Sequence, residues 1–258
     1  MTFIDTNHSY GRWPWTQAGS TSAGELRERL AAEGIAEAWV ASTDALLAED
    51  IGLAEERMFR ELDGLDNIRF VRTLNPAQGG SAAMYRAALA DPRCVAVRLA
   101  PGLHHYHLFD ECVNALGEVM QAEGNLPVQI LYRFDDIRHR LPQLTTKEPQ
   151  PLDVVCLAQR FPRLRFLVQG ATNGEPGQMA GRHIVHRDRE NIWIDTSFLD
   201  YMDVLAKVTE NIPADRLVFG TAEPFLYARS NVLLFQSPTL SDADKAMIAR
   251  GNAAAMSR

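Results

Sequence analysis

Short apolar runs rich in β-branched residues alternate with longer stretches of helical periodicity along the whole sequence. Such alternation predicts a parallel sheet with helices packed against it. We expect strands near residues 3–5, 36–41, 68–74, 94–99, 128–132, 165–169, 192–196 and 216–220. Eight strands of this kind predict an α/β fold, a single (β/α)8 TIM-like barrel that spans residues 1–258.

The first helix illustrates the signals that begin and end the helices. Residues 22–25 form a capping box, and Leu26 and Leu30 follow with i, i+4 spacing. Gly34 supplies the C-terminal stop. Residues 241–256 have the pattern of an extra C-terminal helix, which we expect to pack against the outside of the barrel.

Composition narrows the class of protein. With 46% hydrophobic residues, a chain of 258 residues can bury a sizeable core, and its net charge of -7 disfavours a nucleic-acid surface. No apolar run approaches the ~20 residues of a membrane span, and no signal peptide begins the sequence. Cys94, Cys112 and Cys156 lack metal-type spacing and fit a reducing compartment. We therefore expect a cytoplasmic protein that binds neither nucleic acid nor membrane.

Four segments resemble the strands of one enzyme family. Residues 3–9, followed by 11–14, resemble the first strand of the amidohydrolase-related branch (amidohydrolase family 2) of the amidohydrolase superfamily. Residues 124–132 and 161–170 resemble its fifth and sixth strands, and residues 216–225 resemble its last-strand signature. The resemblance covers almost the whole chain and implies the same barrel.

The family's metal-binding side chains are replaced in this sequence. The resemblance places Asn7, Ser9, Leu131, Gln169 and Ala222 where the family has His and Asp ligands. Leu131 and Ala222 offer no lone pair, and neutral amide or hydroxyl oxygens hold transition metals weakly. The sequence therefore predicts a divergent member without the usual metal centre and without a cofactor.

A histidine cluster leaves an alternative open. His104, His105 and His107 follow the strand at 94–99, and with Glu223 they could hold a metal at a new place. The other interpretation is that these rings make loop hydrogen bonds or contact an anionic ligand.

Side chains at the carboxyl ends of barrel strands face the pocket. The residues that we assign to substrate binding on this ground are Asn7, Arg98, Tyr106, Tyr132, Arg133, Gln169, Asp195 and Ser197. Arg98 can bind a carboxylate or phosphate, or pair with Asp195 or Glu223. Glu223 is the candidate general base, with a pKa raised by burial, and His104 is its acid partner. A solvated Glu223 and a loop-stabilising His104 are the alternatives.

Three functions are consistent with the sequence. The first is a metal-independent, lactonase-like hydrolase that acts on a small carboxylate-bearing lactone, ester or related carbonyl compound. The second is a catalytically silent barrel that binds a small anionic ligand or a protein partner. The third is a hydrolase with a relocated metal site. The resemblance also implies a possible homodimer, with residues 13–15 either in the core or at the interface.

Overall fold

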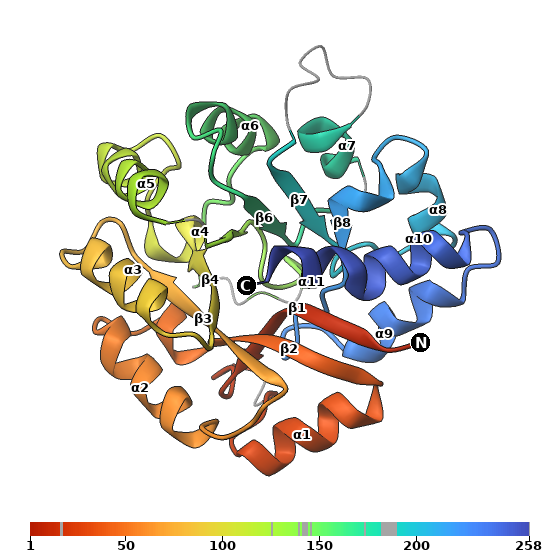
Figure 1. Cartoon of the computed structure of the whole chain (residues 1–258), viewed down its shortest axis with the longest axis horizontal. Helices are drawn as coiled ribbons and strands as arrows, with labels where there is room; N and C mark the ends of the chain where they lie inside the picture. Colours follow the sequence, from red (N-terminus) through yellow and green to blue (C-terminus); the bar gives the residue numbers. More distant parts are fainter. Residues whose placement is uncertain are drawn as a thin grey trace.

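The chain forms a closed ring of parallel strands surrounded by helices (Figure 1). The computed structural model describes residues 1–15, 18–124, 126–138, 140, 144, 146–172, 174–181 and 190–257. The strands, which pair in chain order, are β1 (Phe3–Tyr10), β2 (Ile35–Ser42), β3 (Ile68–Leu74), β4 (Cys94–Leu99), β5 (Val128–Leu131), β6 (Phe166–Gln169), β7 (Ile192–Asp195) and β8 (Leu217–Val218). The predicted (β/α)8 barrel is confirmed.

The ring closes between β8 and β1. The Thr6 backbone N–H donates to the Phe219 carbonyl at 3.0 Å, and the Ser9 N–H donates to the Glu223 carbonyl at 2.8 Å. Closure satisfies the backbone groups that would otherwise be left at two sheet edges. It also places β1 beside the segment that follows β8.

Helices follow the strands and form an outer layer around the barrel (Figure 1). They are α1 (Ala23–Ala32), α2 (Ile51–Glu61), α3 (Ser81–Ala90), α4 (Pro101–His104), α5 (Glu111–Glu123), α6 (Pro151–Arg160), α7 (Glu175–Ala180), α8 (Val204–Thr209) and α9 (Ala228–Leu233). The predicted cap of α1 is present, since Ser22 Oγ accepts a hydrogen bond from the Glu25 N–H at 3.2 Å. No helix in the described part of the chain is long and apolar enough to cross a bilayer.

The C-terminal segment differs from its predicted position. It consists of α10 (Asp242–Ala246), a π-helical turn (Met247–Gly251) and α11 (Asn252–Met256). Ala253 and Met256 pack into the cluster inside the barrel, and α11 crosses the barrel end near its centre in Figure 1. The extra helix is therefore present, but it closes one end of the barrel instead of joining the outer layer.

The inward-facing side chains form three layers, an arrangement typical of this fold. The layer nearest α11 is apolar and contains Ile4, Trp39, Val71, Ala96, Leu167 and Val218. The middle layer is polar and contains Asn7, Arg98, Gln129, Gln169 and Asp195. The layer nearest the mouth is again apolar and contains Trp13, Leu46, Ala100, Leu131 and Phe134. A polar layer is thus enclosed between two apolar ones, which removes it from bulk water.

Candidate functional site

Asp195, the last residue of β7, is the most densely bonded side chain of the polar layer. Its carboxylate accepts hydrogen bonds from Asn7 Nδ2 at 2.6 Å, the Gly170 N–H at 3.0 Å and Ser197 Oγ at 2.8 Å. Gly220 allows this approach, because a Cβ there would lie 2.7 Å from Asp195 Oδ2. Burial raises the pKa of Asp195 to about 6, although the hydrogen bonds oppose the rise. Asp195 therefore exchanges a proton within the physiological range.

Arg98 on β4 is fully buried beneath the mouth. Its guanidinium donates to Gln129 Oε1 and Ser9 Oγ, both at 3.1 Å, and to Asn7 Oδ1 at 3.4 Å. Burial lowers the pKa of Arg98 to about 10, and the negative charge of Asp195 opposes this fall. Among the described residues the guanidinium makes no direct ion pair with Asp195 or Glu223, and Asn7 joins it to Asp195 instead.

The side chains at the family's metal positions do not fit a divalent cation. The side-chain amide of Asn7 donates to Asp195 and accepts from Arg98, and Ser9 Oγ also accepts from Arg98. Leu131 and Ala222 are buried and have no donor atom. Gln169 keeps one unpartnered oxygen, which is a single weak ligand. Within the part of the chain that the structure describes, no three His, Cys, Asp or Glu side chains lie together as a metal cluster. The expectation of no cofactor remains a prediction.

The proposed acid–base pair is not brought together. Glu223 Oε1 accepts a hydrogen bond from Arg29 on α1 at 2.9 Å. His104 Nε2 lies 3.3 Å from the Ala45 carbonyl, and burial lowers its pKa. His107 is exposed beside Lys147, so the histidines and Glu223 do not assemble a relocated metal site among the described residues.

The remaining predicted residues do not join the hydrogen-bonded group around Asp195 and Arg98. Tyr106 is buried in the apolar core. Tyr132 donates to Glu175 at 3.2 Å. Arg133 is held by Glu148 at 3.0 Å and by Glu175 at 3.1 Å. Its guanidinium is therefore already neutralised by two carboxylates.

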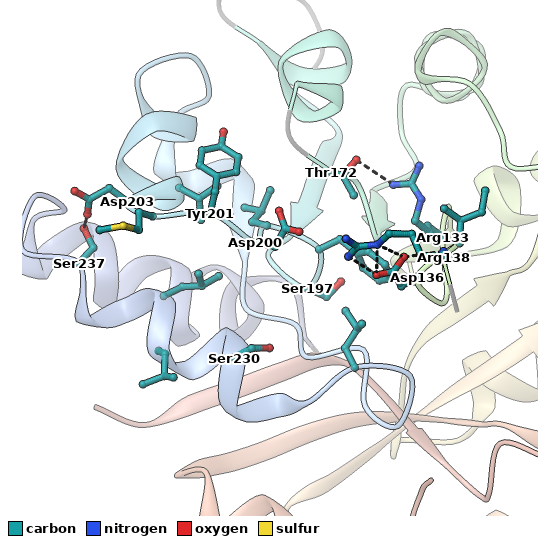
Figure 2. A pocket seen from close by; sticks show the side chains of 18 residues that line it. Arg133, Asp136, Arg138, Thr172, Ser197, Asp200, Tyr201, Asp203, Ser230 and Ser237 are labelled. Atoms are coloured by element: carbon teal, nitrogen blue, oxygen red, sulfur yellow. Dashed lines mark hydrogen bonds and ion pairs between the residues drawn. The ribbon is translucent and has the colours of Figure 1, made fainter. Parts of the chain in front are cut away.

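A cavity of about 690 Å³, here called the mouth cavity, lies over the loops that follow β5 to β8. Figure 2 shows Ser197 between Asp200 on one side and the Asp136–Arg138 pair on the other. The sequence predicted Ser197 and Arg133 for this wall but missed Asp136, Arg138, Ile137, Thr172, Asp200, Tyr201 and Met202. Their position in loops after strand ends was the available signal, but loop conformation is not encoded in strand periodicity. The proline-containing loop at 140–151, which the sequence allows as either a lid over the mouth or an ordinary connector, lies partly outside the described residues, which omit 141–143 and 145.

Ser197 connects the cavity to the polar layer. Its Oγ lies 2.8 Å and 3.0 Å from the two oxygens of Asp195, and the residue lines the mouth cavity. A hydroxyl that is hydrogen-bonded to Asp195 and also lines the cavity can pass a proton from the carboxyl group to a bound ligand. The arrangement can therefore act as a buried general acid with a hydroxyl relay at the cavity wall.

Solved structures with the same fold include several decarboxylases. A 2,6-dihydroxybenzoate decarboxylase in complex with 2,6-dihydroxybenzoate is 16% identical, with a TM-score of 0.73 and 99% of each chain covered. The 5-carboxyvanillate decarboxylase of Sphingomonas paucimobilis is 14% identical, with a TM-score of 0.72, and 100% of this chain and 99% of that chain are covered. A dihydroxybenzoic acid decarboxylase from Polaromonas with bound manganese is 16% identical, with a TM-score of 0.70 and coverage of 99% and 96%. No curated protein matches the sequence.

These neighbours correct the function expected from the sequence. The prediction of a metal-independent, lactonase-like hydrolase is wrong, because the neighbours are decarboxylases of aromatic acids and one of them holds manganese. They support neither the catalytically silent barrel nor the hydrolase with a relocated metal. The prediction inferred the reaction from the fold family and its lost metal ligands, but one barrel supports many chemistries.

A family model agrees with the resemblance of the strand segments. The model described as Amidohydrolase matches residues 22–257, which is most of the chain. This match and the shared barrel show that the chain belongs to the amidohydrolase family, in its amidohydrolase 2 branch.

Proposed function

We propose that this protein removes carbon dioxide from a small aromatic carboxylic acid bound in the mouth cavity. The observation that carries the proposal is the contact between Asp195, whose pKa is raised to about 6, and Ser197 on the cavity wall. Loss of a carboxylate from a ring requires a proton at the carbon that carried it, and Asp195 with Ser197 is suited to supply one. The decarboxylases among the structural neighbours support the substrate class.

The chemistry balances with these two residues. Protonated Asp195 gives its proton to Ser197 Oγ as the hydroxyl gives its own proton to the ring carbon. The bond between that carbon and the carboxylate then breaks, its electron pair returns to the ring, and carbon dioxide leaves. Asp195 recovers a proton from water. Because the side chains at the family's metal positions do not fit a cation, no step is routed through one.

The cavity wall offers an anchor for the substrate carboxylate. Arg138 donates to Asp136 at 2.5 Å and 2.9 Å, and its side chain is 76% exposed. An exposed pair of this kind is weak, so a substrate carboxylate can share the guanidinium. Phe198, Leu199 and Tyr201 supply apolar wall for a ring.

The proposal is tested by product analysis. The protein is incubated with hydroxylated benzoic acids in D₂O, with and without added manganese, and release of carbon dioxide and deuterium on the ring are measured. We expect one deuterium at the position of the lost carboxylate. A panel that gives neither carbon dioxide nor ring deuterium under both conditions would refute the proposed reaction.

Turnover should depend on the protonated form of Asp195. The pKa of Asp195 is raised by burial, so the acid form persists up to about pH 6 and only about one molecule in ten carries the proton at pH 7. We expect kcat/KM to be constant below about pH 6 and to fall about tenfold per pH unit above it. A pH–rate profile of decarboxylation measures this, and a rate that rises with pH between 6 and 8 would exclude Asp195 as the acid.

Removal of the carboxylate anchor should affect binding more than chemistry. We expect Arg138→Ala to raise KM about fivefold with kcat nearly unchanged, because the guanidinium holds the carboxylate equally in ground and transition states. Arg86→Ala, which breaks an exposed ion pair with Glu123 at 2.5 Å, is the matched control and should leave KM unchanged. Equal KM values for both variants would remove Arg138 from the binding site.

A further inference from the structure

A second cavity, of about 460 Å³, lies beside the mouth cavity and shares Asp136 and Leu226 with it. We call it the aromatic cavity, because the described residues that line it include Trp13, Trp15, Phe225 and Tyr227. The ring of Trp13 lies 4.7 Å from that of Trp15 and 5.0 Å from that of Phe225, centroid to centroid. Trp15 and Tyr227 are exposed, so part of the aromatic surface faces the solvent.

Carboxylates share this wall with the rings. Asp135 and Asp136 both line the aromatic cavity, where Arg140 is the cation among the described lining residues. Arg140 is already committed, since it donates to Asp135 at 2.7 Å and to Glu148 at 2.9 Å and lies over the Phe134 ring at 4.7 Å.

The described lining residues thus include two carboxylates and one guanidinium, although Asp136 is also bound by Arg138, which is outside this lining. Burial raises the pKa of Asp135, and its hydrogen bond to Arg140 opposes the rise. The carboxylate of Asp135 beside these ring faces attracts a cationic guest more than an anionic one.

We propose that the aromatic cavity binds an organic cation of the alkylated ammonium class, with the ammonium head between the Trp13, Trp15 and Tyr227 rings and the Asp135 carboxylate. The negative face of an aromatic ring attracts a cation, and quaternary ammonium groups are recognised by such rings. A metal ion would gain little here, since it prefers several oxygen ligands to ring faces. The site is independent of the proposed decarboxylation, because it uses neither Asp195 nor Ser197.

The test uses two probes of the same shape. Choline and its uncharged isostere 3,3-dimethylbutan-1-ol are titrated into the full chain, and binding is followed by tryptophan fluorescence and calorimetry. We expect choline to bind about tenfold more tightly than the isostere, because the charge adds attraction to the rings and to Asp135. Equal affinities would overturn the proposal and leave a purely apolar cavity.

Variants assign the binding to the cavity. Trp15 is partly exposed, so Trp15→Ala should fold, and we expect it to weaken choline binding about tenfold, with Trp15→Phe retaining most of it. Asp135→Asn should weaken choline but not the isostere. Phe109→Ala, at an exposed aromatic residue outside the aromatic cavity, is the matched control. Undiminished choline binding in Trp15→Ala refutes the site. Asp195→Asn should bind choline normally, so the outcome does not depend on whether the chain decarboxylates anything.

Discussion

Replacing Arg98 with alanine is expected to lower the free energy of unfolding by about 3–5 kcal/mol. The guanidinium is fully buried and holds Ser9, Asn7 and Gln129 in place through three hydrogen bonds. Its removal leaves those polar groups without a donor and leaves the buried negative charge of Asp195 without its nearby cation. Urea unfolding of the wild-type protein and the variant at pH 8 measures the difference.

The pH dependence of the loss in unfolding free energy shows how much of it is electrostatic. The pKa of Asp195 is already raised when folded, so its protonation contributes stability below its unfolded pKa of about 4, and this contribution is lost as pH rises through about 6. Without Arg98 the folded pKa rises further, so the destabilisation should be smaller at pH 5 than at pH 8. Arg86→Ala, at an exposed ion pair, should change the unfolding free energy little at either pH. A loss of the same size at both pH values would mean that packing alone explains the Arg98 variant.

Periodicity was sufficient to predict the barrel and most of its strands. The strand ends were predicted less accurately, since β1 continues to Tyr10 and β8 stops at Val218. The reason lies in a contact between distant parts of the chain: Asp5 accepts hydrogen bonds from the N–H and hydroxyl of Thr221 at 3.0 Å and 2.6 Å. A carboxylate that binds the segment after β8 turns the chain there, and no local pattern around Thr221 reports it.

The candidate site was only partly predictable for the same reason. Strand ends correctly indicated that Asn7, Arg98, Asp195 and Ser197 lie near one another, because the carboxyl ends of barrel strands converge. The orientation of the Glu223 side chain depends on its hydrogen bond from Arg29, which is 194 positions away in the sequence. The mouth cavity depends on loop conformation, so its position was not predictable from spacing.

The replacement of a metal ligand position and the apolar layer nearest the mouth involve neighbouring residues. Leu131, which the resemblance places at a family ligand position, packs with Trp13 and Phe134 over the polar layer. Phe225 follows Ala222 closely and packs at 5.0 Å from Trp13. This apolar layer between the mouth and the polar layer excludes water from the barrel axis. A ligand must therefore approach from the side, where Ser197 lines the mouth cavity. This geometry explains why the proposed proton path runs through Ser197 and not along the axis.

Asp195→Asn is expected to reduce kcat for decarboxylation about 10²–10⁴-fold, because an amide cannot deliver a proton. Ser197→Ala should reduce kcat as well, since it interrupts the path while Asp195 keeps its bonds to Asn7 and Gly170. The double variant is the decisive measurement: two residues on one proton path lose their effect together, so it should be no slower than the slower single variant. Effects that multiply would show that the residues act separately. Wild-type turnover in D₂O should be slowed because a proton moves in the limiting step, and the residual turnover of Asp195→Asn should no longer fall above about pH 6. A residue that only supported the fold would change neither the isotope effect nor the shape of the pH profile.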